Sequence, residues 1–369
     1  MPSRTLSASA IAEVDVEDIR RAFEPLSSDS VPQSAVQPTA KTHTLTGLGI
    51  GGIGSALPGQ IVTNEDLQRD YGMDPEWIEQ RTGIRQRHRV LPGQSTSDLA
   101  IEAGRAAIAN AGLTATDIDL VVVGTFTPDH RGTNVGCYVQ AALGINAPAF
   151  DVQAACSGFM YALTTAGQFV ATGNSKRALV IGADVVSQLC NPAEKRVYPL
   201  FGDGAGAVVL QAGSPQQGLL SYQLGADGSQ ADLLLCPVGG SRTPATPEAI
   251  AAGQHFLSME GRQVYKWAVQ TVVDSIRLVA DRSGFGIQDI DLFLLHQANI
   301  RIIDHAVKEL GIDPKRVVNN VDRVGNTSAA SIPLVLDDAH QTSRLHRGDL
   351  VMMCGFGAGL TWGTGLFRW

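Results

Sequence analysis

The first candidate for chemistry is Cys156, which lies between an expected strand and an expected helix. Residues 149–152 are predicted to form a short strand. The small, apolar, proline-free run at 157–172 is predicted to form a helix that stops at Gly173. A cysteine at this junction faces the unpaired N–H groups of the helix, which lower a thiol pKa and favour a nucleophile. The alternative is a buried cysteine that acts as a small hydrophobic side chain.

Two further candidates lie in the second half of the chain. His296 follows the apolar run 292–295, and apolar residues then recur at helical spacing. Asn326 leads into a second expected helix. Taken singly, His296 suits a satisfied core histidine and Asn326 suits a helix N-cap. Taken together with Cys156, each lies at an element junction, where an α/β fold presents side chains to one cleft. Such a set supplies a nucleophile and two hydrogen-bond donors, and a Gly-rich loop at 355–359 adds backbone N–H groups for an oxyanion hole.

The elements that must position these residues alternate along the chain from Thr44 onward. Residues 99–111 are predicted to form a helix closed by Gly112. The continuous apolar run 119–124 is typical of a strand covered on both faces. This alternation predicts an α/β fold.

Short internal repeats indicate two related halves. Asp-Ile-Asp-Leu occurs at 117–120 and again at 289–292, and Gly-Asp-Gly-Ala-Gly at 202–206 resembles Gly-Phe-Gly-Ala-Gly at 355–359. Their common order predicts a duplicated αβ unit, with one half at 44–213 and the other at 214–369.

Composition narrows the class of protein. The chain has 369 residues and a net charge of −8, which argues against nucleic-acid binding as its main role. Its five cysteines are scattered and include no Cys-x-x-Cys pair, so a disulfide framework or structural zinc is not expected. No apolar run approaches the roughly 20 residues of a membrane span, and no secretory signal is visible. We therefore predict a cytoplasmic protein.

Residues 1–43 differ from the rest of the chain. They are rich in Ser, Ala, Pro and Thr, and they are predicted to form a flexible N-terminal extension with one short helix at 16–26 and a linker at 27–41. A transit peptide is an alternative, although the acidic residues between 13 and 18 are unusual for one.

A rival motif lies at 49–54, where Gly-Ile-Gly-Gly-Ile-Gly fits G-x-G-x-x-G and Asp70 follows about 20 residues later. However, the residues after Gly54 lead to Pro58 and break a helix rather than open one. Asp70 also falls in an expected helix at 64–71 and not at a strand end. Dinucleotide binding is therefore disfavoured.

Six ordered segments resemble one family. They are ACSGF around Cys156, FGDGAGAVVL from Phe201, HQANIRII from His296, GNTSAASIP from Gly325, GFGAGLTWG from Gly355 and EWIEQRTGIR from Glu76. From about Thr44 to Trp369 the chain resembles the β-ketoacyl-acyl-carrier-protein synthase III family of the thiolase fold. The resemblance implies a five-layered αβαβα fold, a homodimer, acyl-CoA and malonyl-acyl-carrier-protein substrates, and no metal or other cofactor.

The resemblance also implies roles for individual residues. Cys156 would take the acyl group, while His296 and Asn326 would handle the malonyl thioester in a decarboxylative condensation that starts fatty acid synthesis. The other implied positions are an oxyanion loop at Gly357, Ala358 and Gly359; CoA contacts at Trp77, Arg81, Arg196 and Asn299; an apolar wall at Phe356; and a basic patch of Lys266, Arg301 and Lys308 for the acyl carrier protein.

Some residues depart from the family pattern. The loop reads Gly-Ala-Gly at 357–359, where many members have three glycines. Gly132 falls where some members place an aromatic residue that closes the partner's acyl pocket, so a primer longer than acetyl is expected. Residues 237–255 are expected to form a surface loop near the tunnel mouth. The alternatives are a member that primes a polyketide pathway, an acyltransferase that does not decarboxylate, and a non-catalytic scaffold. The retained Cys–His–Asn set argues against the scaffold.

Overall fold

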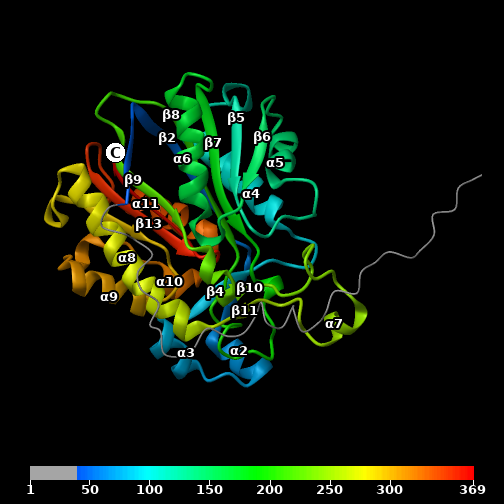
Figure 1. Cartoon of the computed structure of the whole chain (residues 1–369). Helices are drawn as coiled ribbons and strands as arrows, with labels where there is room; N and C mark the ends of the chain where they lie inside the picture. Colours follow the sequence, from blue (N-terminus) through cyan, green and yellow to red (C-terminus); the bar gives the residue numbers. More distant parts are fainter. Residues whose placement is uncertain (1–39) are drawn as a thin grey trace, which may run out of the picture. The chain divides into compact units, whose positions relative to one another are not determined.

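The computed structural model describes residues 40–369, so the expected helix at 16–26 and most of the linker at 27–41 lie outside the described residues. Two five-stranded sheets organise the described part (Figure 1). The first sheet has the order β2 (Leu48–Ala56), β8 (Gly204–Ala212), β7 (Arg177–Asp184), β5 (Leu120–Gly124) and β6 (Ala149–Val152). The second has the order β1 (His43–Thr46), β9 (Gly218–Ala226), β14 (Thr361–Arg368), β13 (Leu350–Gly357) and β12 (Leu292–Leu295).

The two sheets share a strand pattern. In the first, β2 pairs antiparallel with β8, β8 antiparallel with β7, and β7 parallel with β5. In the second, β9, β14, β13 and β12 repeat the same sequence of pairings. This shared pattern supports our proposal that 44–213 and 214–369 are duplicated halves. Strand β1, at the boundary of the N-terminal extension, pairs with β9 of the second sheet.

The repeated sequences differ in what they form. Asp-Ile-Asp-Leu has the same structure twice, because the 3-10 turns Ala115–Asp117 and Ile287–Asp289 lead into β5 and β12. The glycine repeat does not, since residues 202–206 lead into β8 while residues 355–357 end β13.

Helices and sheets alternate in five layers. Helices α6 (Gly158–Ala171) and α11 (Ser331–Gln341) pack against strands of both sheets and therefore lie between them. Helices α4 (Thr96–Asn110) and α5 (Val135–Leu143) cover the outer face of the first sheet. Helices α8 (Gly261–Ser283) and α9 (Ile300–Leu310) form an apolar cluster with the second sheet, and Figure 1 shows both on its outer side. This arrangement is the expected αβαβα order.

Local sequence explains the main elements. All five residues of β5 are buried, as expected for a strand covered by helices on both faces. The glycines of the 49–54 motif lie inside β2, where a Cβ on Gly52 or Gly54 would come within 2.3 Å of the α4 backbone. These glycines therefore allow α4 to pack closely on the sheet and do not form a strand-to-helix phosphate turn.

Shorter elements complete the described part of the chain. They are β3 (Gln60–Thr63), β4 (Gln86–Arg89), α2 (Asn64–Tyr71), α3 (Pro75–Thr82), β10 (Leu234–Leu235), α7 (Pro247–Ala251), β11 (Ser258–Met259) and α10 (Val321–Val324). Helix α7 lies inside the expected surface loop at 237–255, where Thr246 caps it and Pro247 begins it. Within residues 40–369, no helix combines the length and the apolar character needed to cross a membrane.

Candidate active site

Cys156 lies in a tight 3-10 turn, Ala155–Ser157, which joins β6 to α6. Ala155 adopts φ +43°, a conformation that costs a non-glycine residue free energy and is held by its surroundings. The Ser157 hydroxyl donates to the Ala154 carbonyl at 2.7 Å and lies 2.9 Å from the Thr361 hydroxyl. The turn is thus tied to β14, in the other half of the chain.

The end of β13 passes directly over the cysteine. A Cβ built on Gly357 would stand 3.0 Å from Cys156 Sγ, and one on Gly355 would stand 3.1 Å from Ser157 Cα. Only glycine allows this approach without displacing the thiol. Of the expected loop residues, Gly357 therefore lies against Cys156, and Ala358 and Gly359 follow it along the chain.

His296 follows β12, and its backbone N–H donates to the Cys354 carbonyl of β13 at 2.9 Å. Its ring stands edge-on to Phe356, with 5.0 Å between ring centroids. Because Phe356 immediately precedes Gly357, the imidazole and the Cys156 thiol meet the same end of β13. Burial lowers the pKa of His296 to about 3, so the ring is neutral at neutral pH. Its Nδ1 has no hydrogen-bond partner among the described residues.

Asn326 lies between α10 and the 3-10 turn Ser328–Ala330. Its backbone pairs with the segment 200–202 through Asn326 N to Leu200 O at 2.8 Å and Gly202 N to Asn326 O at 3.0 Å. Its Oδ1 accepts from Ser328 N at 2.9 Å, while its Nδ2 donates to no other described residue. The N-cap interpretation is wrong, since Ala330 precedes α11; Asn326 instead closes a local turn and keeps one amide donor free.

The expected low thiol pKa is also wrong. Burial is the main reason that the pKa of Cys156 is raised to about 12; the nearby carboxylate of Asp184 contributes in the same direction, and the Ser328 hydroxyl opposes it. The Ser328 hydroxyl is itself buried without a well-oriented hydrogen-bond partner among the described residues. The physical reason is that a thiolate loses more hydration in this enclosed turn than the helix end returns. The resting pair is therefore a neutral thiol beside a neutral imidazole.

Sequence reasoning missed several supporting residues. Arg87 is fully buried and donates to the Val62 and Pro199 carbonyls and to Asn64 Oδ1. Burial lowers the pKa of its guanidinium to about 9. Arg87 supports the 199–202 segment that pairs with Asn326, yet in the sequence it is one arginine in an arginine-rich strand.

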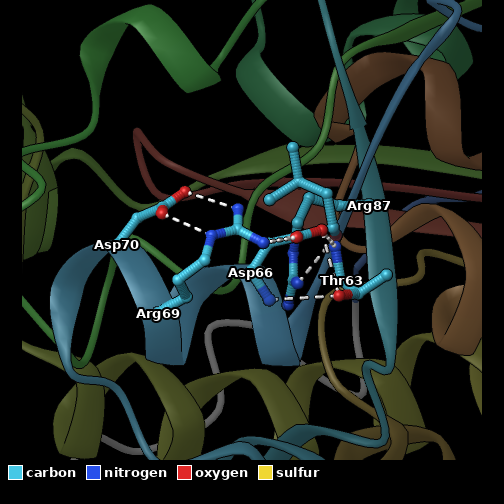
Figure 2. Close-up of polar contacts among 6 residues, drawn as sticks. Thr63, Asp66, Arg69, Asp70 and Arg87 are labelled. Atoms are coloured by element: carbon cyan, nitrogen blue, oxygen red, sulfur yellow. Dashed lines mark hydrogen bonds and ion pairs between the residues drawn. The ribbon is translucent and has the colours of Figure 1, made fainter.

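Figure 2 shows how Arg87 meets the start of α2. Thr63 caps this helix by accepting from Asp66 N, and Asp66 Oδ2 accepts in return from Thr63 N. Arg69 on the exposed side pairs with both Asp66 and Asp70. The capping box therefore fixes the Val62–Thr63 corner to which Arg87 donates.

The expected CoA contacts are partly brought together. Asn299 caps α9, and its Nδ2 donates to the Arg81 carbonyl at the end of α3 at 3.1 Å. Trp77, on α3, is 40% exposed. Arg196 is exposed and has no side-chain partner in the described chain, whereas neighbouring Lys195 donates to the Gly72 carbonyl.

The expected carrier-protein residues lie on adjacent helices. Lys266 on α8 and Arg301 and Lys308 on α9 are exposed, and none forms a salt bridge within residues 40–369. Gly132 lies on an exposed loop with φ +92° and no neighbour near its Cβ position, so this chain does not bring it to its own Cys156. No group of three His, Cys, Asp or Glu suited to a metal occurs in the described part.

Comparisons with known proteins agree with this geometry. Residues 150–228 match the model of 3-oxoacyl-[acyl-carrier-protein] synthase III, and residues 280–369 match its C-terminal model. A β-ketoacyl-[acyl-carrier-protein] synthase III from Rhodopirellula baltica is 48% identical, covering 88% of this chain and 99% of the relative. One from Symbiobacterium thermophilum is 47% identical, covering 87% and 98%.

Solved structures give the same result. The 3-oxoacyl-(acyl carrier protein) synthase III of Pseudomonas aeruginosa has a TM-score of 0.81 and 40% identity, covering 88% of this chain and 98% of that one. The priming β-ketosynthase of the R1128 polyketide pathway has a TM-score of 0.81 and 32% identity, covering 90% and 99%. The layers and the cysteine turn define a condensing enzyme of the thiolase fold. Within that class, the chain belongs to the β-ketoacyl-acyl-carrier-protein synthase III family.

Proposed function

We propose that the chain catalyses the decarboxylative condensation of an acyl-CoA primer with malonyl-acyl-carrier protein, the reaction that starts fatty acid synthesis. The observations that support this proposal are that Cys156 and His296 each contact a residue at the end of β13, and that the turn Ser328–Ala330, which follows Asn326, packs on the cysteine turn, in a chain of this family. Priming of a polyketide pathway is less well supported, since the fatty-acid relatives reach 48% identity and the polyketide synthase reaches 32%.

The first half-reaction loads the primer. Cys156 Sγ attacks the acyl-CoA carbonyl carbon, the new C–S bond forms, and the bond to the CoA sulfur breaks. Because the resting thiol is neutral, its proton must leave as the bond forms; His296 relays it to the departing CoA thiolate. The backbone N–H of Cys156 and those of the 357–359 loop stabilise the oxyanion.

The second half-reaction makes the carbanion. The bond between C2 and the carboxylate of the malonyl group breaks, carbon dioxide leaves, and the electron pair passes to the thioester as an enolate. Two neutral donors, His296 and Asn326 Nδ2, stabilise the enolate oxygen. Phe356 gives the malonyl carboxylate an apolar wall, which disfavours its charge.

Condensation completes the cycle. The enolate C2 attacks the acyl carbon on Cys156, a C–C bond forms, and the C–S bond breaks. The departing Cys156 thiolate takes up a proton from solvent and returns to the neutral form. The steps balance with acyl-CoA, malonyl-acyl-carrier protein and one proton as reactants, and with the β-ketoacyl-carrier protein, CoA and carbon dioxide as products, so the proposed function includes no resident cofactor.

Exposed residues support the assignment of the substrates and of the partner proteins. We assign Trp77, Arg81, Arg196 and Asn299 to CoA, and Lys266, Arg301 and Lys308 to the acidic carrier protein. We assign Gly132 to the acyl pocket of a second copy. Strand β6 is an edge strand, and its Phe150 packs against the 37%-exposed Phe169, which supports a homodimer through this edge. All five cysteines are free, in keeping with a reducing cytoplasm.

The test is formation of a β-ketoacyl-carrier-protein product from a panel of acyl-CoA primers and malonyl-acyl-carrier protein, followed by mass spectrometry of the carrier protein. Wild-type protein should form the product and Cys156→Ala should not. Product formation by Cys156→Ala, or loading with no malonyl-dependent product for any primer, contradicts the proposal.

A further inference from the structure

Asp184 is a buried carboxylate outside the Cys–His–Asn set. It ends β7 and is fully enclosed. Its Oδ1 accepts from Thr125 Oγ1 at 2.9 Å, Phe126 N at 2.9 Å, and Thr127 N and Oγ1 at 3.2 and 2.8 Å. Its Oδ2 accepts from Ala329 N at 3.1 Å. One carboxylate thus ties the end of β7 and the segment after β5 to a loop 145 residues further along the chain.

The loop that Asp184 holds is strained. Ser328 adopts φ +51°, which L-residues rarely adopt. The loop also lies directly on the sheet, because a Cβ on Gly182 would come within 2.3 Å of the Ala329 carbonyl oxygen. A residue in this conformation persists only when its neighbours hold it there. The Ala329 N–H bond to Asp184 immediately follows the strained residue.

The strained residue orients the amide of Asn326. Ser328 N donates to Asn326 Oδ1 at 2.9 Å, which directs the other end of the amide, Nδ2, away from the loop. If Ser328 returned to an ordinary backbone conformation, this N–H would turn and the amide would lose its fixed orientation. The chain of contacts therefore runs from Asp184 through Ala329 and Ser328 to Asn326.

We infer that Asp184 is a positioning residue for the second half-reaction, since it holds the 327–330 loop so that Asn326 Nδ2 is free for the malonyl thioester. The inference rests on the proposed function and adds a residue that does not itself touch substrate. This role predicts that loss of Asp184 slows decarboxylation more than loading, whereas a purely structural role would lower both rates equally.

Asp184 also affects the Cys156 thiol, and its removal should make this thiol ionise more readily, whereas it should slow decarboxylation. Burial is the main cause of the raised pKa of the Cys156 thiol, and burial also raises the pKa of Asp184 itself. When Asp184 is ionised, its negative charge adds to the raised pKa of the thiol. Neutralising this charge should therefore make the thiol ionise at lower pH. A loosened fold would also hydrate the thiol and lower its pKa, so the ratio of decarboxylation to loading decides the test.

The experiment compares Asp184→Asn with Asp119→Asn in the full-length protein. Asp119 is a matched control, since it accepts from Ser175 Oγ, Lys176 N and Arg177 N at the opposite end of the same two strands. Three quantities are measured: acetyl-CoA loading by intact mass, carbon dioxide release from malonyl-acyl-carrier protein, and the pH midpoint of Cys156 alkylation by iodoacetamide.

For Asp184→Asn we expect the ratio of decarboxylation to loading to fall about tenfold or more, and the alkylation midpoint to move to lower pH. Asp119→Asn should change neither. An unchanged ratio, or an equal fall in both half-reactions whatever the midpoint, overturns the inference. If Asp184→Asn does not fold, Thr125→Val removes one donor from the carboxylate and should lower the same ratio; an unchanged ratio there also overturns the inference. Wild-type protein that neither loads nor decarboxylates would instead refute the proposed function.

Discussion

Gly357 lies against Cys156 so closely that a Cβ on Gly357 would stand 2.8 Å from the cysteine Cβ. This contact joins the end of β13 in the second half of the chain to the nucleophile turn in the first. Since Phe356 and His296 meet at the adjacent residue, the contact fixes the thiol relative to the imidazole.

Gly357→Ala should impair loading. The added methyl group must displace the Cys156 side chain or the strand, and overpacking of this kind costs about 1–3 kcal/mol, which corresponds to roughly a tenfold to hundredfold slower reaction. The rate at which acyl-CoA loads Cys156 measures this impairment. Gly59→Ala, at a glycine with open space around it, should leave the rate unchanged. An unimpaired Gly357→Ala would mean that this contact does not position the thiol.

Asn326→Ala should separate the half-reactions. Loading does not use the amide, so it should remain near the wild-type rate. Decarboxylation loses one of two enolate donors and should fall by about 10²–10³-fold. Pre-steady-state loading and carbon dioxide release measure the two rates. Equal losses in both would refute the division of roles.

The pH dependence of Cys156 alkylation should follow the raised thiol pKa. Burial holds the folded-state pKa at about 12, so the thiolate fraction and the alkylation rate should keep rising with pH above pH 9. His296 is neutral, so His296→Ala should not shift this profile toward higher pH. Peptide mapping separates Cys156 from exposed Cys137. A rate that levels off below pH 7 would indicate a thiolate–imidazolium pair and contradict this account.

Charge reversal in the basic patch of Lys266, Arg301 and Lys308 should weaken binding of malonyl-acyl-carrier protein and leave binding of acyl-CoA unchanged. Lys308→Glu and Arg301→Glu should each raise KM for malonyl-acyl-carrier protein about fivefold at low salt, and less at high salt, since exposed charges contribute roughly 1 kcal/mol and are screened. KM for acyl-CoA should not change. Lys176→Glu, an exposed lysine beside the first sheet, is the matched control. Equal effects of all three substitutions would contradict the assignment of this patch as the docking surface for the carrier protein.

Arg87→Met should lower stability more than it changes chemistry. It leaves the Val62 and Pro199 carbonyls and Asn64 Oδ1 without their donor in a buried site, which costs about 1–3 kcal/mol for each unsatisfied group. Thermal unfolding followed by circular dichroism measures the loss. Arg69→Met removes exposed ion pairs, which solvent screens, and should leave stability nearly unchanged. Similar losses from both variants would contradict the role given to Arg87.

Periodicity and motifs predicted much of the fold. The strand at 149–152 and the helix at 64–71 are confirmed residue for residue. The ends of the helix are marked in the sequence by the Thr63 capping box and by Gly72. The location of Cys156 and His296 at element ends was likewise readable from the flanking runs. The pairing of β1 with β9 could not be predicted from the sequence, because tertiary packing determines which strand pairs at the edge of a sheet.

Some features of the site depend on contacts that are distant in sequence. Asp184 ends an apolar strand like many other aspartates, and only the fold shows that Ala329 N lies beside it. The thiol pKa was predicted in the wrong direction because local sequence shows the helix end but not the burial or the anionic neighbour. For the same reason, Asn326 was interpreted as a cap when its amide closes a turn with Ser328.

The most direct test of the central claim is intact-mass and peptide-mapping spectrometry of the wild-type protein, first with acyl-CoA and then with malonyl-acyl-carrier protein. We predict that the acyl mass appears on the peptide containing Cys156, disappears when the malonyl substrate is added, and reappears in a β-ketoacyl-carrier product. Acylation at another residue, or an acyl-Cys156 that malonyl-acyl-carrier protein never discharges, would contradict the account.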